Sequence, residues 1–227
     1  MARSCTICVF AKPPRAGMVK TRLASSIGAE AAATLASAFL VDTWQMVAGL
    51  KWAQPVLAAT EESGFPWLPR NVPRWLQGDG DLGARIERVL CRALERGCPA
   101  LAIGADTPGL PVPLMVDARF ELERADAVLG PATDGGFYVI GMRDCPPGAL
   151  AGLPWSDGQT FAATLARLRA LRLRVTVLEP WFDVDRIEDL ARLRALIRFG
   201  GLKAPETTKA LAEIGLFRSA SGHDSCA

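Results

Sequence analysis

Basic residues gather in one short segment near the start of the chain. Lys12, Arg15, Lys20 and Arg22 stand within eleven residues, although the whole protein contains only five lysines. Two prolines and Gly17 keep this segment out of a helix, so backbone amides and cationic side chains can converge on one anion. The pattern predicts a phosphate-binding loop made by the four basic residues and Gly17. A solvated basic loop is the structural alternative.

A first candidate carboxylate, Asp106, stands in a turn directly after the apolar run 100–104. A carboxylate on a tight turn at the carboxyl end of a strand suits a hard cation such as Mg²⁺, which is often shared with substrate phosphates. The alternative is a turn cap next to Pro108.

Two further carboxylates, Asp183 and Asp185, follow the apolar run 174–178. Alternation along an extended backbone places both on one side, so two carboxylates could face one cation. Asp185 with Glu188 also forms a capping-box pattern for a helix that begins at Ile187, so a plain helix cap is the alternative.

Two glycine-rich segments complete the candidates. The first holds Asp134, Gly135 and Gly136, and we expect it to be a substrate-facing loop, although Asp134-Gly135 is also a hairpin-turn dipeptide. The second holds Asp81, which is either part of an active-site loop or the cap of the helix that follows.

Composition excludes several other functions. The 26 basic and 24 acidic residues give no chain-wide field for a nucleic acid or an anionic membrane, and no window of 18 residues is apolar enough to span a bilayer. The one histidine, His223, lies in the C-terminal tail, which argues against Ser-His-Asp catalysis and histidine-ligated zinc. Cys5 and Cys8 point to opposite faces of a predicted strand and read as core thiols of a reducing cytosol. We therefore expect a cytoplasmic protein that binds no nucleic acid.

Short apolar runs alternate with longer helical patterns along the chain, which is typical of β-α-β units around a mainly parallel sheet. We expect one α/β domain over residues 1–218, with helices on both faces of the sheet, and a disordered tail over 219–227. The segment Glu61–Trp75 is the most loop-like stretch. The predicted strands are 6–10, 55–59, 100–104, 127–129, 137–141 and 174–178, and the predicted helices are 30–47, 82–96, 113–123, 159–171, 187–198 and 208–214. The first loop, Asp106, Asp134 and Asp185 all follow strands, where ligands bind in open α/β sheets.

Five ordered motifs over residues 5–197 carry a resemblance to a known family. They read FAKPPRxGxVKTRL, GDGDLG, IGADTP, GPATDGGFY and DVDxxEDL. Together they resemble a bacterial family of transferases with the GT-A, nucleotide-diphospho-sugar transferase fold. That family is similar to phospholactate guanylyltransferases and molybdenum-cofactor nucleotidyltransferases.

The resemblance implies a site for a nucleoside di- or triphosphate, with Mg²⁺ or Mn²⁺ on Asp106 and Asp185 and with phosphates held by Lys20 and its neighbours. We therefore expect Lys20, Asp106 and Asp185 to be the catalytic residues. Asp183, which the alternation places beside Asp185, is a further candidate metal ligand. A small-molecule acceptor would complete the reaction, and no oligomeric state is implied. The expected function is a glycosyltransferase acting on a nucleotide sugar. The alternative is a nucleotidyltransferase that uses a nucleoside triphosphate and releases pyrophosphate. The cationic loop favours a triphosphate, whereas the lack of tandem glycines before Arg15 favours a sugar donor.

Overall fold

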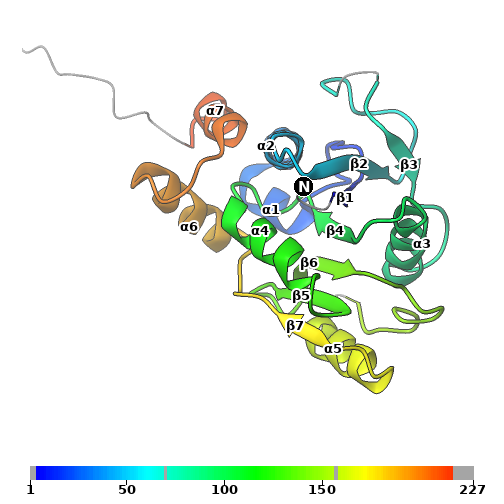
Figure 1. The fold of residues 1–227 in the computed structure, drawn as a ribbon. Helices are drawn as coiled ribbons and strands as arrows, with labels where there is room; N and C mark the ends of the chain where they lie inside the picture. Colours follow the sequence, from blue (N-terminus) through cyan, green and yellow to red (C-terminus); the bar gives the residue numbers. More distant parts are fainter. Residues whose placement is uncertain (1–3, 69–70, 156–157, 217–227) are drawn as a thin grey trace, which may run out of the picture.

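A seven-stranded sheet forms the centre of the molecule (Figure 1). The computed structural model describes residues 4–68, 71–155 and 158–216. The strands are β1 (Cys5–Ala11), β2 (Ala53–Ala59), β3 (Arg74–Leu76), β4 (Ala100–Gly104), β5 (Ala127–Pro131), β6 (Phe137–Met142) and β7 (Val175–Val177). Their spatial order is β3-β2-β1-β4-β6-β5-β7, and β6 alone runs antiparallel to its neighbours. The carboxyl ends of the other six strands therefore lie at one edge of the sheet.

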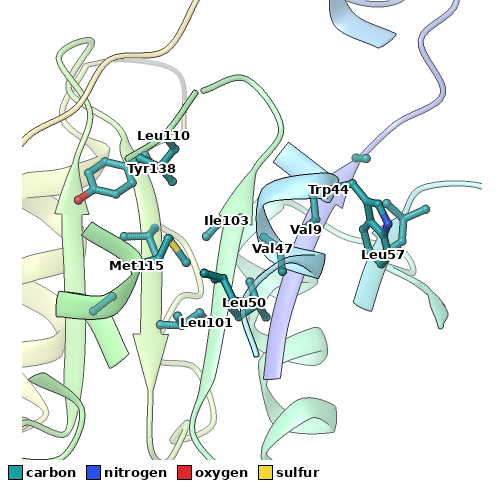
Figure 2. Close-up of a cluster of buried hydrophobic side chains, with 14 of the residues drawn as sticks. Val9, Trp44, Val47, Leu50, Leu57, Leu101, Ile103, Leu110, Met115 and Tyr138 are labelled. Carbon is teal, nitrogen blue, oxygen red and sulfur yellow. The ribbon is translucent and has the colours of Figure 1, made fainter. Parts of the chain in front are cut away.

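Helices cover both faces of this sheet, as the sequence predicts. They are α1 (Thr21–Ile27), α2 (Ala29–Ala48), α3 (Leu82–Leu94), α4 (Val112–Glu121), α5 (Thr160–Ala170), α6 (Ile187–Arg198) and α7 (Pro205–Glu213). On one face α2 and α4 pack on the sheet, where Val47 lies near Ile103 and Leu50 lies near Leu101 (Figure 2). On the other face α3 and α5 contribute Leu90 and Leu168 to a second core. Cys5 and Cys8 belong to these two opposite cores, which confirms that they point to opposite faces.

A third hydrophobic cluster joins the remaining helices beside the sheet. It combines Leu23 of α1, Phe39 of α2, Val184, Leu193 of α6 and Leu211 of α7, all of them fully buried or nearly so. The cluster brings the end of the basic loop and the segment before α6 onto the same helix, α2. It therefore fixes the relative positions of two segments that lie far apart in the sequence.

Two elements were not expected from the sequence. The strand β3 lies at the end of the segment Glu61–Trp75 that we expected to be a loop, and the helix α1 begins inside the basic segment at Thr21. Neither shows a hydrophobic period in the sequence, since β3 is a three-residue strand at the end of a proline-rich segment and α1 buries only Leu23. The predicted tail 219–227 lies outside the described residues. Within the described ranges no helix has both the length and the apolar surface needed to cross a bilayer.

Candidate functional site

Three charged residues from three distant segments meet at the edge of the sheet where the parallel strands end. The Nζ atom of Lys20 lies 2.6 Å from Oδ1 of Asp185 and 2.9 Å from Oδ1 of Asp106. The Lys20 side chain is 4% exposed, while those of Asp106 and Asp185 are 58% and 36% exposed. The structure thus brings together the three residues that the sequence predicts to be catalytic, with the ammonium group buried between two accessible carboxylates.

The backbone around Lys20 is shaped for this position. Gly17 has a φ of 75° and lies in the turn closed by the bond from Met18 N–H to the carbonyl of Arg15. Lys20 itself has a φ of 47° and caps the N-terminus of α1 in the left-handed conformation. This conformation costs a residue with a Cβ about 1–2 kcal/mol, so the surrounding contacts must hold it. Val19 and Leu23, both buried, anchor the chain on either side of it.

The segment after β7 delivers Asp185 to the same place. Phe182 and Val184 are buried in the third cluster, so the alternate residues Asp183 and Asp185 face the other way, as the alternation predicts. The N–H of Val184 donates to the carbonyl of Asp106 at 3.0 Å. This bond ties the end of the β7 segment to the turn after β4 and sets the two carboxylates side by side.

A cleft of about 350 Å³ opens at these residues. Its lining comes from the first loop, α1, α2 and the two aspartates. The described residues that line it are Lys12, Val19, Lys20, Thr21, Arg22, Ala36, Asp106 and Asp185. Lys12 and Arg22 are exposed in the cleft, so the cleft carries more positive than negative side chains and suits an anion.

The pKa values of two groups in this neighbourhood are shifted. Burial alone would lower the pKa of Lys20, but Asp106 and Asp185 together raise it above its ordinary value, so the ammonium form is retained. Burial, followed by repulsion from Asp106 and Asp134, raises the pKa of Asp183 to about 7. Asp183 is absent from the described lining of the cleft. Its place as a metal ligand stays a prediction.

Two other predicted binding residues make contacts with the protein. The guanidinium of Arg15 forms a bidentate ion pair with Glu61, at 2.9 Å and 2.7 Å, away from the described lining of the cleft. Asp81 accepts a hydrogen bond from Ala84 N–H and caps α3, which is the structural alternative that its sequence left open. Their roles in binding stay predictions.

The glycine-rich loop between β5 and β6 is a hairpin turn. Asp134 accepts a hydrogen bond from Gly136 N–H at 2.9 Å, within the turn that joins these antiparallel strands. Gly135 has a φ of 89°, and a Cβ there would lie 2.0 Å from the carbonyl oxygen of Gly158. The space beside Gly135 is therefore occupied by the protein's own backbone at Gly158. Binding of a substrate by this loop stays a prediction.

The cap of α6 differs from the expected one. The carboxylate of Asp189, and not that of Glu188, accepts hydrogen bonds from the N–H groups of Asp185 and Arg186. The capping-box prediction for Asp185 with Glu188 is therefore wrong by one residue. The side chain of Asp185 accepts instead from the ammonium group of Lys20, at 2.6 Å.

Gln77 is a positioning residue that the sequence reasoning did not single out. Its buried amide donates to the carbonyls of Ala58 and Ala11, at 2.8 Å and 3.2 Å, and so ties the end of β2 to the end of β1, where the basic loop begins. A buried amide in this place is signalled in the sequence only by a lone glutamine directly after the apolar pair Trp75-Leu76.

The donor atoms around the cleft fit a divalent cation of the Mg²⁺ class. Such cations are commonly held by one or two carboxylates plus phosphate oxygens of the substrate, and Asp106 and Asp185 supply two carboxylates beside a basic cleft. Among the described residues no group of three or more histidine, cysteine or acidic side chains is arranged to hold a metal. The carboxylate pair would therefore need further oxygen ligands from a substrate or water.

Comparison with known proteins places the chain in a family. The sequence model described as an uncharacterised protein conserved in bacteria (DUF2064) matches residues 34–157. The chain belongs to this family. No curated protein matches it. The segment that the family model matches includes Asp106, but it does not include Lys20 or Asp185, which lie before and after it in the sequence.

Solved structures share the fold of this DUF2064 member. A protein from Desulfovibrio desulfuricans G20, described as a "putative nucleotide-diphospho-sugar transferase", is similar with a TM-score of 0.83 and 29% identity over 93% of this chain and 96% of that one. A 4-diphosphocytidyl-2C-methyl-D-erythritol synthase has a TM-score of 0.56 and 14% identity over 87% and 99%. A CMP:2-keto-3-deoxy-manno-octonic acid synthetase complexed with CTP has a TM-score of 0.54 and 11% identity over 87% and 99%. The chain has the nucleotide-diphospho-sugar transferase fold.

Proposed function

We propose that this protein is a divalent-metal-dependent glycosyltransferase that uses a nucleotide sugar as its donor. The observation that carries the proposal is the meeting of Lys20 with Asp106 and Asp185 in a basic cleft at the carboxyl ends of the strands. Ligands of open α/β sheets bind at this edge. The name given to the Desulfovibrio desulfuricans protein supports the same donor class.

The charges of the cleft favour a diphosphate over a triphosphate. Of the four cations in the first loop, Arg15 pairs with Glu61 at the surface, and Lys20 pairs with two carboxylates. Only Lys12 and Arg22 remain, among the described lining residues, as exposed cations. A nucleotide sugar carries less negative charge than a nucleoside triphosphate, and it is therefore the better match for this cleft.

The protein's own residues would bind and orient the donor. Lys12 and Arg22 are placed to hold phosphate oxygens, and Asp106 and Asp185 would hold Mg²⁺ or Mn²⁺. When bound, the cation supplies Lewis-acid neutralisation of the charge that develops on the leaving diphosphate. Little covalent chemistry is asked of the protein, because positioning and electrostatic stabilisation provide most of the rate in such transfers.

Nucleotidyl transfer is the second candidate. Lys20 lies at the base of the same cleft, and it becomes a third cation for a longer phosphate chain if a divalent cation takes its place at Asp106 and Asp185. The names of two more distant structures, a cytidyl-transferring synthase and a synthetase complexed with CTP, are consistent with this reaction for their own proteins. The two reactions differ in the product that is released.

A ligand screen followed by a product assay tests the proposal. Thermal shift with nucleotides and nucleotide sugars, with and without Mn²⁺, should identify a donor, since a ligand at about 100 times its Kd adds about 2.7 kcal/mol of stability. With that donor and an acceptor, we expect nucleoside diphosphate to accumulate and pyrophosphate to stay at background.

The variants Asp106→Asn and Asp185→Asn should keep the fold and lose the Mn²⁺-dependent part of donor binding. Unchanged Mn²⁺-dependent binding in both variants would refute the metal assignment. Pyrophosphate release that requires a nucleoside triphosphate and a phosphorylated acceptor would overturn glycosyl transfer in favour of nucleotidyl transfer.

A further inference from the structure

A lysine ammonium occupies the position between the two carboxylates that are proposed to hold a metal. Asp106 and Asp185 each direct the same oxygen, Oδ1, at the Nζ atom of Lys20. The ring centroid of Phe39 lies 5.9 Å from this Nζ atom and covers it from the helix side. The side chain of Lys20 is 4% exposed, so the ammonium makes its contacts in an enclosed place at the base of the cleft.

The location of Lys20 is built into the fold. Its left-handed backbone turns the chain from the basic loop into α1, and no side-chain hydrogen bond caps that helix. Strained backbone of this kind persists only where surrounding packing determines it, and it clusters at functional positions. Here Val19 and Leu23 supply the packing. The lysine is therefore held at the carboxylates by the chain and has limited freedom to turn into water.

The carboxylates need a cation, and Lys20 needs an anion. Two carboxylates that approach one point repel each other unless a positive charge lies between them. A buried ammonium that loses its partners is strongly unfavourable. A divalent cation on Asp106 and Asp185 would meet the positive charge of Lys20 at short range. It can replace Lys20 at the carboxylates only if another anion then pairs with the lysine.

The phosphates of a donor are such an anion. Lys12, Thr21 and Arg22 line the same cleft as Lys20, so a phosphate chain held by these residues would lie within the reach of the ammonium group. Arriving with a divalent cation, it would leave Lys20, Asp106 and Asp185 each paired with an opposite charge.

We propose that Lys20 is the counter-cation of Asp106 and Asp185 in the donor-free state. When donor and divalent cation bind together, the divalent cation takes the place of Lys20 at the two carboxylates, and Lys20 pairs with the donor's phosphates. The inference rests on the proposed function for the nature of the donor. It goes beyond that function because it makes cation binding and phosphate binding mutually dependent. Such coupling is reciprocal and commonly amounts to about 5- to 150-fold in affinity.

The decisive measurement is Mn²⁺ binding to the protein without any nucleotide. Isothermal titration of Mn²⁺ into the wild type, Lys20→Met and Lys12→Met separates the roles of two lysines that line one cleft. Removal of Lys20 removes the competing charge, so we expect Mn²⁺ to bind Lys20→Met about tenfold or more tightly than the wild type. Lys12 is exposed and forms no ion pair with the described residues, so the Mn²⁺ affinity of Lys12→Met should stay within about threefold of that of the wild type. An unchanged or weaker Mn²⁺ affinity of folded Lys20→Met would overturn the proposal.

A second measurement uses the unmodified protein, in case Lys20→Met does not fold. Inorganic pyrophosphate serves as the anionic probe, and the affinity of the protein for Mn²⁺ is measured with and without it. The binding of Mn²⁺ to free pyrophosphate is measured separately and subtracted. We expect pyrophosphate to strengthen Mn²⁺ binding to the wild type by about tenfold. Equal Mn²⁺ affinity in both conditions would overturn the proposal. Neither measurement needs the correct nucleotide, so absence of glycosyl transfer together with these two results would refute the proposed function and leave the counter-cation role standing.

Discussion

Two arginines in the first loop offer a matched test of the phosphate grip. Arg22 lines the cleft, whereas Arg15, seven residues earlier, is held by Glu61 away from the described lining. Both are surface arginines, and the side chain of Arg15 is 53% exposed. The substitutions Arg22→Ala and Arg15→Ala therefore remove the same charge from two places in the basic segment, the first on α1 and the second in the loop before it, and only the first removes it from the proposed phosphate site.

The expected magnitudes differ by more than the error of a binding assay. A hydrogen bond to a charged group contributes about 1.5–3 kcal/mol, so Arg22→Ala should weaken the Mn²⁺ complex of a nucleoside diphosphate by about 10- to 150-fold. Arg15→Ala breaks an exposed ion pair, which is worth about 0–1 kcal/mol, and changes a screened charge, so we expect less than about a threefold effect.

Isothermal titration with the nucleoside diphosphate selected by thermal shift provides the measurement, and the matching nucleoside without phosphates is the control. The control ligand should bind Arg22→Ala and the wild type alike. If Arg15→Ala lost as much affinity as Arg22→Ala, the anion would contact the outer side of the loop, and the assignment of the cleft would be wrong. If the nucleoside lost as much affinity as the diphosphate, the loop would not be a phosphate grip.

Three further predictions concern the scaffold. The buried carboxylate of Asp42 accepts hydrogen bonds from two backbone N–H groups at the start of α7, at 3.0 Å and 2.8 Å. Asp42→Ala should therefore lower the free energy of unfolding by about 2–4 kcal/mol and Tm by roughly 5–15 °C. Asp42→Asn keeps one acceptor oxygen and should lower both by less. Asp126 is paired with Arg174, which lowers the pKa of this carboxyl below its ordinary value. Chemical denaturation should therefore find Asp126→Asn less stable than the wild type at pH 7. The difference should vanish as the pH falls through the lowered pKa of the folded state, because the carboxyl is then protonated in both states. Burial raises the pKa of Cys8 to about 12, so at pH 8 iodoacetamide and peptide mass mapping should find the exposed Cys91 alkylated in the folded protein and Cys8 only after unfolding. The first prediction is contradicted by a stability loss under about 0.5 kcal/mol for Asp42→Ala. The second is contradicted by a pH-independent stability loss for Asp126→Asn, and the third by equal labelling of Cys8 and Cys91 in the folded protein.

Hydrophobic pattern predicts most of this fold because burial is periodic. All six strands expected from apolar runs are present, and α6 has the expected bounds Ile187–Arg198. The same reasoning missed β3, whose three residues end a segment rich in proline and tryptophan, whereas β7, which is equally short, lies within the alternating run 174–178. Two of the catalytic candidates, Asp106 and Asp185, could be located from the sequence because each follows a strand, and parallel strands end at one edge of the sheet.

Partners of individual side chains could not be predicted in the same way. Arg15 and Lys20 are both cations of one loop, yet Arg15 pairs with Glu61 and Lys20 with two aspartates. Spacing along the loop does not distinguish them, because the choice depends on the left-handed turn at Lys20 and on packing against α2. For the same reason, Asp189 caps α6, where the sequence predicts Glu188.

The integrity of the site depends on parts of the chain outside the segment that the family model matches. Residues 34–157 include Asp106 but neither Lys20 nor Asp185. Those two residues are separated by 165 positions and are brought together by the third cluster, to which α1, α2, α6 and α7 all contribute buried side chains. Loosening of α7, for example through Asp42→Ala, would disturb Lys20 and Asp185 before it disturbed the sheet that carries Asp106. We therefore expect such a variant to lose the pairing of the three residues at temperatures where the central sheet is still intact, so the outer helices would position the candidate site as well as complete the scaffold.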